Sequence, residues 1–265
     1  MRPLRPDEAL MTPASAISRG GGLGREGWRQ AYFAYLPASR DDAFVRAMVD
    51  GLARYVDLGD RARVLDFGCG TGAQTLEIAR RGCRVLGVDS DLPRLSEARS
   101  GSDKTLWVHF ISKDMRRIGY EAEFHVAVNL HHPLGRGEEH DERCLAAVHR
   151  ALKPKGRLVL DLPSRDWLVR RMDPGSGERA LLDAKTGRFQ AGEAPGLRVY
   201  CLSELVRLLE RARFAVRAIH GGWEGEPFGF DAMRMIVVAE KVTVAEKARK
   251  EDDLPRAIRI KGRGR

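Results

Sequence analysis

Residues 64–72 read VLDFGCGTG, and this stretch decides the fold. The apolar residues that lead into it are typical of a buried β-strand, and glycines follow at positions 68, 70 and 72. Glycines at alternate positions let the backbone turn sharply and approach a ligand with no Cβ in the way. A helical pattern begins at Ala73, so the unpaired N–H groups of a helix start face the same point.

An acidic residue stands where the next strand ends. Residues 83–89 form that strand, and Asp89 lies seventeen positions beyond Gly72. In a doubly wound sheet the two strand ends are neighbours, so a carboxylate there can hold both hydroxyls of a ribose. The glycines alone fit any tight strand–helix turn, but with Asp89 they predict a site for a nucleoside-bearing ligand. Dinucleotide-binding loops differ, because they space their glycines as GxGxxG.

Helical and strand patterns alternate along the rest of the chain. Helices are predicted at residues 41–56, 73–81, 93–99, 141–152 and 203–213. Strands are predicted at residues 63–67, 83–89, 108–111, 124–130, 156–162, 214–220 and 233–239. This rhythm predicts an α/β fold with a Rossmann-like, doubly wound, seven-stranded sheet. The last two strands are joined by a hairpin, so the sheet is expected to be mostly parallel with one antiparallel strand.

Two local features are also expected. A small hairpin at residues 179–192, turning at 184–187, belongs to an insertion over the active site at about 163–200. A third extended piece is expected at 197–200. Ser203 followed by Glu204 is a suitable start for the helix that follows.

The GxGxG loop, with an acid two positions before its first glycine, resembles the first motif of the class I S-adenosylmethionine-dependent methyltransferases. The resemblance covers residues 28–241, and residues 151–158, ALKPKGRL, look like the family's structural "LKPGG" turn. It implies S-adenosylmethionine as cofactor and S-adenosylhomocysteine as product. It also implies that Asp89 binds the ribose and that Asp114 reads the adenine amine. The cofactor-binding residues implied in this part of the chain are Asp66, Gly68, Cys69, Gly70, Gly72, Asp89, Ser90, Asp114, Met115, Asn129 and Leu130.

Finer matches resemble bacterial small-molecule methyltransferases. They lie at residues 164–168 (SRDWL), 186–188 (TGR), 198–200 (RVY) and 233–241 (MRMIVVAEK). In that subgroup a helical N-terminal segment with aromatic residues folds over the cofactor, and Trp28 and Tyr32 occupy the equivalent place. A helix that only packs against the core explains these two aromatics equally well.

The reacting end of the site is expected at residues 128–135, VNLHHPLG. In the subgroup this segment more often reads "NLFxSFGYF", from which His131 and His132 depart. A histidine of near-neutral pKa can take a proton from the methyl acceptor. Adjacent side chains diverge, so at most one of the two is expected to point at substrate, and a hydrogen-bonded wall residue is the alternative. His131 and His132 are therefore the candidate catalytic residues.

Other site classes are less favoured by the same segment. It has neither the Asn/Asp-Pro-Pro-aromatic motif of adenine amino-methyltransferases nor the Pro-Cys of cytosine-C5 enzymes. The spacing of His131, His132, His140 and His149 fits no standard metal site, so no metal is expected. Three arginines, Arg165, Arg188 and Arg234, fit either an acidic substrate or pairing with nearby carboxylates.

The composition is that of a soluble globular protein. Of 265 residues, 43% are hydrophobic and 31% charged, and no apolar run is long enough to span a membrane. The N-terminus shows no secretory signal, and four widely spaced cysteines suit a reducing compartment, so a cytoplasmic protein is expected.

The net charge of +9 lies mostly at the two ends. Residues 1–30 carry five basic and three acidic side chains and residues 241–265 carry nine and four, which leaves the part between them at +2. We expect flexible basic tails at 1–24 and 242–265 around a methyltransferase domain at 25–241. Nucleic acid is a possible partner through the tails but is not favoured.

The predicted function is methyl transfer from S-adenosylmethionine to an oxygen, nitrogen or carbon atom of a small molecule, by a monomer or homodimer without a membrane partner. Two alternatives remain open at this stage. One is an RNA or protein methyltransferase that uses the basic tails, and the other is a cofactor-binding protein without turnover.

Overall fold

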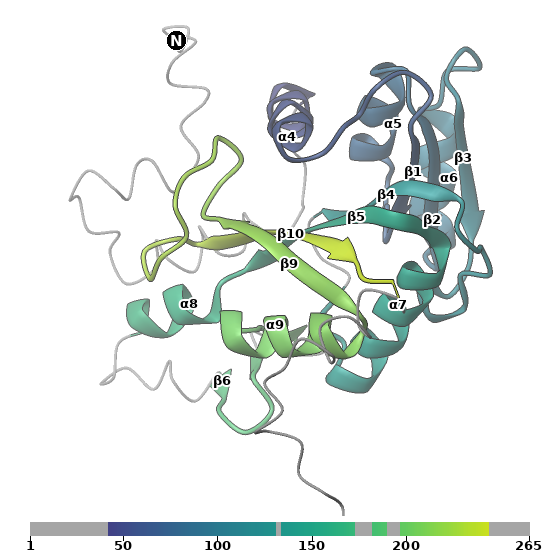
Figure 1. Cartoon of the computed structure of the whole chain (residues 1–265). Helices are drawn as coiled ribbons and strands as arrows, with labels where there is room; N and C mark the ends of the chain where they lie inside the picture. The colour runs from purple at the N-terminus through teal and green to yellow at the C-terminus, as the bar shows by residue number, and fades with distance from the viewer. Residues whose placement is uncertain (1–41, 131–133, 173–181, 190–196, 244–265) are drawn as a thin grey trace, which may run out of the picture.

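A computed structural model describes residues 42–130, 134–172, 182–189 and 197–243 (Figure 1). The helices of this part are α4 (Asp42–Tyr55), α5 (Ala73–Arg80), α6 (Leu92–Ser100), the short 3-10 helix η1 (Met115–Arg117), α7 (Glu138–Ala151), α8 (Arg165–Arg171) and α9 (Leu202–Arg211). The strands are β1 (Arg63–Phe67), β2 (Arg84–Asp89), β3 (Val108–Ser112), β4 (Phe124–Leu130), β5 (Leu152–Pro163), β6 (Leu182–Asp183), β7 (Arg188–Phe189), β8 (Leu197–Arg198), β9 (Phe214–His220) and β10 (Arg234–Lys241).

Seven strands form one sheet in the order β3-β2-β1-β4-β5-β10-β9. Neighbours from β3 to β5 are parallel, whereas β10 is antiparallel to both β5 and β9. The prediction of a mostly parallel sheet with one antiparallel strand is therefore confirmed. The strand order reverses between β1 and β4, which is where doubly wound sheets bind their ligands.

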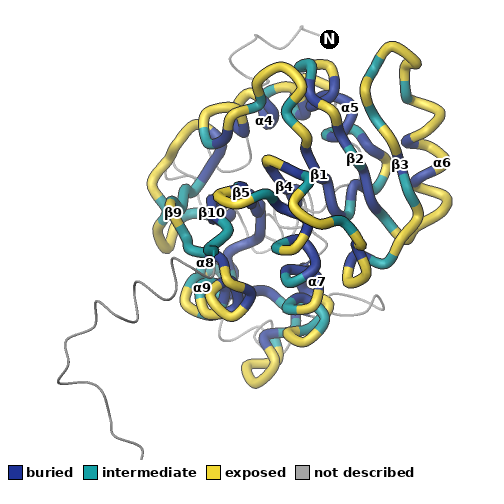
Figure 2. Tube along the Cα trace, turned by 45° about the vertical axis from the view of Figure 1, so that its right-hand side comes forward, coloured by how far each residue is buried: buried dark blue, intermediate teal, exposed yellow. Residues whose placement is uncertain are grey.

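Helices cover both faces of this sheet because side chains of the central strands alternate between two cores. Val64 of β1 packs with Met48 and Leu52 of α4 on one face. Leu65 of β1 packs with Leu145 of α7 and with α9 on the other. Figure 2 shows the buried central strands between these layers, so the doubly wound arrangement is confirmed.

The predicted insertion contains a small three-stranded antiparallel sheet, in the order β6-β7-β8. Its hairpin turns between Asp183 and Arg188, as predicted. The Thr186 hydroxyl donates to the Asp183 carboxylate at 2.6 Å and closes that turn. Strand β8 supplies the predicted third extended piece.

Several element boundaries differ from the predictions, and α7 begins at Glu138, three residues earlier than expected. β5 begins at Leu152, four residues earlier than expected, directly after α7. Its pairing with β4 shifts register between Phe124 and Val126, which takes up the early residues. α8 was not predicted, because two helical turns give only a short periodic pattern. Ser164 caps this helix by accepting the Trp167 N–H at 3.3 Å.

The expected start of α9 at Ser203 is wrong. The helix begins at Leu202, and Cys201 is its N-cap. Glu204 explains the difference, because its carboxylate reaches back to the Cys201 N–H at 3.4 Å and also pairs with Arg165 at 2.9 Å.

The predicted tails at 1–24 and 242–265 lie outside the described residues, apart from Val242 and Thr243. The N–H of Val242 still pairs with the Arg213 carbonyl at 3.0 Å. The domain limits of 25–241 therefore remain a prediction.

Candidate cofactor-binding site

The turn between β1 and α5 is built from glycines in the left-handed region. Gly70 has φ +55° and Gly72, the N-cap of α5, has φ +77°. A Cβ on Gly72 would lie 2.8 Å from the Phe110 ring, so that position is closed by packing. A Cβ on Gly70 would meet only the end of the Arg94 side chain, at 3.8 Å. The loop therefore packs tightly at Gly72 and leaves room for a ligand at Gly70.

Asp89 lies beside this loop, as expected for neighbouring strand ends. Its Oδ2 accepts the Gly70 N–H at 2.8 Å, and its Oδ1 accepts the Asp91 N–H at 3.0 Å. A carboxylate has about four lone-pair directions, so it keeps acceptor capacity for two ligand hydroxyls. Ser90 is exposed next to it.

Asp66 lies inside the turn rather than on its surface. It is 2% exposed and accepts the Thr75 hydroxyl at 2.5 Å, which ties the end of β1 to the first turn of α5. Burial raises the pKa of this carboxyl to about 7, the Thr75 hydrogen bond lowers it, and the nearby Asp89 charge raises it. Cys69 is also buried, and desolvation raises the pKa of its thiol far above the ordinary range.

Asp114 follows β3 and caps the short helix η1. Its carboxylate accepts the Arg116 N–H at 2.9 Å and both Nε and Nη2 of the Arg116 guanidinium, which holds the pKa of this carboxyl well below its usual range. Met115, the next residue, is buried. An adenine amine at Asp114 would therefore share the carboxylate with Arg116.

Asn129 is the second-last residue of β4. It is fully buried, and its Nδ2 donates to the Phe67 carbonyl at 2.5 Å, which fixes the orientation of the amide. Its Oδ1 is buried with no hydrogen-bond partner in the described structure. A buried acceptor without a donor is costly, so this atom fits a donor supplied by a ligand. Leu130, beside it, is buried at 6% exposure.

Four predicted site residues, Trp28, Tyr32, His131 and His132, lie outside the described residues. The other two histidines of the predicted set are separated. His140 contacts Asp141 through Nδ1 at 3.1 Å, whereas His149 lies 3.3 Å from the Val242 carbonyl. Within residues 42–130, 134–172, 182–189 and 197–243, no group of three His, Cys, Asp or Glu side chains is placed to hold a metal ion.

The arginines of the insertion and of β10 pair within the protein. Arg165 pairs with Glu204 at 2.9 Å, and Arg234 lies 3.5 Å from the buried Asp161. Arg188 donates to the Arg136 carbonyl. For Arg165 and Arg234 the structure therefore shows pairing with carboxylates, one of the two expected uses.

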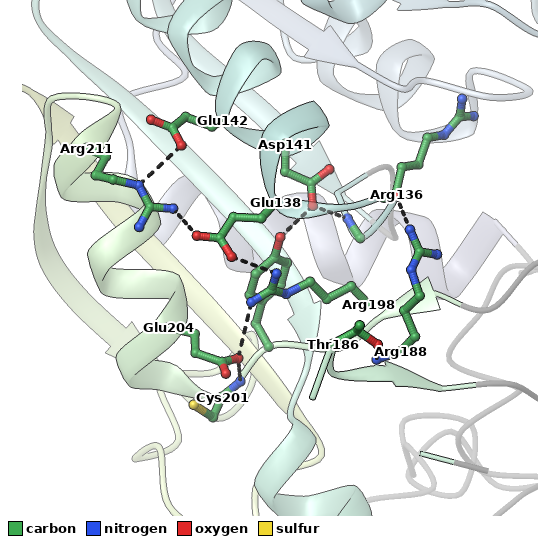
Figure 3. Close-up of polar contacts among 12 residues, drawn as sticks. Arg136, Glu138, Asp141, Glu142, Thr186, Arg188, Arg198, Cys201, Glu204 and Arg211 are labelled. Carbon is green, nitrogen blue, oxygen red and sulfur yellow. Dashed lines mark hydrogen bonds and ion pairs between the residues drawn. The ribbon is translucent and has the colours of Figure 1, made fainter. Parts of the chain in front are cut away.

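A buried polar group around Asp141 was not found from the sequence (Figure 3). Asp141 is fully buried and hydrogen bonds to both Gly135 and Tyr200. The only sequence signal is an acid on the otherwise apolar face of α7 that carries Cys144, Leu145 and Val148.

The sheet order, the glycine turn after β1 and the acid after β2 define the class I S-adenosylmethionine-dependent methyltransferase fold. The Asp89 carboxylate beside Gly70 and the unpaired Oδ1 of Asn129 at the end of β4 are acceptors available for the donors of that cofactor.

Comparisons with known proteins agree. Residues 64–156 match the family model described as a methyltransferase domain. The chain is 29% identical over 129 residues to the putative methyltransferase YqeM of Bacillus subtilis, covering 47% of this chain and 52% of that protein. It is 25% identical over 219 residues to the cypemycin N-terminal methyltransferase of a Streptomyces species, covering 69% and 84%.

Solved structures show the same fold. The CcbJ methyltransferase of Streptomyces caelestis aligns with a TM-score of 0.61 at 16% identity, covering 79% of this chain and 96% of that chain. A TehB-like methyltransferase of Corynebacterium glutamicum aligns with a TM-score of 0.52 at 20% identity, covering 82% and 98%. Residues 64–156 are a methyltransferase domain, the described chain has the class I S-adenosylmethionine-dependent methyltransferase fold, and S-adenosylmethionine is its cofactor. No helix in the described part of the chain has the length and apolarity that a membrane span requires.

Proposed function

We propose that the protein transfers the methyl group of S-adenosylmethionine to a small-molecule acceptor and releases S-adenosylhomocysteine. The observation that carries the proposal is the Asp89 carboxylate, hydrogen-bonded to the Gly70 N–H at 2.8 Å beside the open side of the glycine turn. The cofactor, when bound, supplies a methyl group on a positively charged sulfur. The protein then has to bind the nucleoside, exclude water and orient the acceptor for in-line attack.

Each end of the site has its own residues in this proposal. Asp89, with Ser90, binds the ribose hydroxyls, and Asp114 with Met115 contacts the adenine. The buried Oδ1 of Asn129 accepts a hydrogen bond from the ammonium group of the methionine part, with Leu130 as its neighbour. The turn itself is formed by Asp66, Gly68, Cys69, Gly70 and Gly72. Trp28 and Tyr32 remain predicted to cover the cofactor.

The acceptor end of the site follows β4. His131 or His132 remains the predicted proton acceptor, and the attacking atom is an oxygen, nitrogen or carbon. One relative favours a second candidate acceptor, a peptide amine, because the cypemycin N-terminal methyltransferase is matched over 84% of its length.

Two measurements test the proposal. Calorimetry should detect S-adenosylmethionine binding to the full chain. Conversion to S-adenosylhomocysteine is then followed with small amines, phenols and carboxylic acids, with a short peptide carrying a free N-terminus, and with RNA. Turnover with a small molecule supports the proposal, and turnover with the peptide or RNA alone supports the corresponding alternative. Cofactor binding without turnover on any acceptor, or no binding at all, contradicts it.

A further inference from the structure

Asp141 is a fully buried carboxylate that the proposed cofactor site does not use. We propose that Asp141 is a positioning residue for methyl transfer, whose carboxylate holds Gly135, after β4, and Tyr200, after β8, together as one junction on the acceptor side of the site. This inference rests on the proposed function for its catalytic consequence. Its structural consequence can be measured without any acceptor.

The Asp141 carboxylate is fully buried and fully engaged. Oδ2 accepts the Gly135 N–H at 2.7 Å and the Tyr200 hydroxyl at 2.6 Å, while Oδ1 contacts His140 Nδ1 at 3.1 Å. Burial and then the Asp141 charge raise the pKa of Tyr200 far above its ordinary range, so its hydroxyl remains a donor. A buried carboxylate is stabilised only by such partners, so the groups that donate to it are held in place.

Gly135 receives a second, independent restraint. Its carbonyl accepts the Arg198 N–H at 2.7 Å, so its two peptide groups are bonded to α7 on one side and to β8 on the other. A Cβ at this position would lie 2.7 Å from the Arg198 carbonyl oxygen, and the residue has φ +113°. The close approach of the two segments therefore requires glycine here.

Exposed and half-buried ion pairs surround the same junction (Figure 3). The Arg198 guanidinium pairs with Glu138 at 2.8 Å and lies over the Tyr200 ring at 4.8 Å. Glu138 also pairs with Arg211 of α9, and Glu204 at the start of α9 lies 4.0 Å from Arg198. Strand β8 is thus attached to both helices on this face of the sheet, and Asp141 is the buried member of the group.

The junction follows the carboxyl end of β4, the strand after which the acceptor is expected. Leu134 and Gly135 follow the carboxyl end of β4, and Leu134 lines a small apolar cavity with Leu162, Val199 and Tyr200. Asp89 lies at the end of β2, on the other side of β1 in the sheet. Loosening the junction should therefore disturb the acceptor side and leave the Asp89 contacts intact.

The test uses the full chain with four variants. Asp141→Asn keeps the shape and one acceptor oxygen, Asp141→Ala removes both, and Tyr200→Phe removes one donor. Glu139→Gln is the matched control, because it neutralises a carboxylate on the same helix that is 81% exposed and forms an ion pair with Arg143. Hydrogen exchange is measured by peptide, and S-adenosylmethionine affinity by calorimetry.

In Asp141→Asn, the amide hydrogen exchange rate should rise about tenfold in two peptides, one covering residues 134–137 and one covering residues 197–200. The reason is the loss of charge-assisted hydrogen bonds to the carboxylate. Exchange at 63–72 and 84–89 and the cofactor Kd should stay within about twofold of the wild type. The increase in exchange rate should be larger in Asp141→Ala than in Asp141→Asn. Tyr200→Phe should also raise the exchange rate of both peptides, and Glu139→Gln should leave both rates unchanged. With an acceptor from the panel, kcat/KM should fall about tenfold or more in Asp141→Asn at unchanged cofactor Kd.

Three results would overturn the inference: unchanged exchange in both peptides, a rise in only one of them, or a rise throughout the chain with a parallel loss of cofactor affinity. If the wild type binds S-adenosylmethionine but methylates nothing, the proposed function fails. The paired exchange result and the unchanged cofactor Kd would still support the junction.

Discussion

Asp89 provides the most direct test at the scale of a residue. Asp89→Ala removes the acceptor of the Gly70 N–H and the proposed acceptor of the ribose hydroxyls. Two charge-assisted hydrogen bonds contribute about 1.5–3 kcal/mol each, so S-adenosylmethionine affinity should fall about 100-fold or more. Calorimetry measures the loss, and Asp60→Asn, an exposed carboxylate outside the site, is the control. Equal affinity in Asp89→Ala and wild type would remove the main support for the site.

Asp66 predicts a pH dependence of stability. Its pKa is raised to about 7 in the folded protein by burial, against an ordinary value of 3.8, so the folded state binds more protons than the unfolded state between these values. The Asp66 contribution to the free energy of unfolding therefore decreases as pH rises from about 4 to about 7.

Urea unfolding of the cofactor-free protein at pH 5 and pH 7.5 tests this. The wild type should lose more stability over that interval than Asp66→Asn, by an amount on the order of a few kcal/mol. Asn retains an oxygen that can accept the Thr75 hydroxyl, so the variant is expected to fold. Parallel pH profiles for the two proteins would contradict the raised pKa.

The position of a single residue could be predicted from the sequence where that residue is part of a local motif. Asp89 and the glycines are positioned by the strand and turn in which they occur, so the spacing indicated their place. Asp66 was predicted to bind cofactor, and the structure places it inside the turn against Thr75, an arrangement that a linear spacing does not show. Asn129 was predicted from a resemblance, whereas its unpaired Oδ1 is visible only once Phe67 and β4 are side by side.

At the scale of an element, two glycines of the turn between β1 and α5 have different roles, because Gly72 is packed against the core and Gly70 leaves room beside it. Gly72→Ala adds a Cβ 2.8 Å from Phe110 at a positive φ, so unfolding free energy should fall by about 2–4 kcal/mol from backbone strain and overpacking. Gly70→Ala meets only the end of Arg94 and should cost about 1–2 kcal/mol.

Ligand binding should follow a different order. Gly70→Ala is expected to lose cofactor affinity more than stability, because its Cβ would occupy the open side of the turn. Urea unfolding and calorimetry on the two variants separate these effects. A Gly70→Ala protein that binds S-adenosylmethionine as the wild type does would show that the cofactor does not approach at that position.

The long elements were predicted from apolar periodicity, and their ends were less well predicted. Apolar residues recur with a period of 3.6 in a helix and 2 in a strand wherever one face is buried. The bounds of α4 and β4 were therefore predicted nearly correctly. Cap geometry depends instead on single side-chain contacts. The start of α9 was misplaced because Glu204 bonds back to Cys201, and α8 was missed because its cap, Ser164, has too short a helix behind it.

At the scale of the whole molecule, the uneven charge makes a prediction about the ends of the chain. The part between residues 30 and 241 carries only +2 of the net +9, so cofactor binding should not depend on the basic ends. A protein lacking residues 1–24 and 243–265 should keep its S-adenosylmethionine affinity within about twofold, by calorimetry.

RNA binding distinguishes the remaining alternative. If the tails recruit RNA, the full chain should bind it with a steep salt dependence that the shortened protein lacks. Loss of cofactor affinity on shortening would contradict the proposed domain limits of 25–241.

By itself, the sequence determined the fold class, the glycine turn after β1 and the neighbouring ends of β1 and β2, because those depend on local periodicity and on glycines at positive φ. Only the tertiary structure decided which distant groups meet. Gly135, Asp141 and Tyr200 belong to a loop, a helix and the end of an insertion, and their shared hydrogen bonds exist because the sheet brings these segments together. A buried charge is stabilised by the partners that surround it in space, and the chain order does not record them.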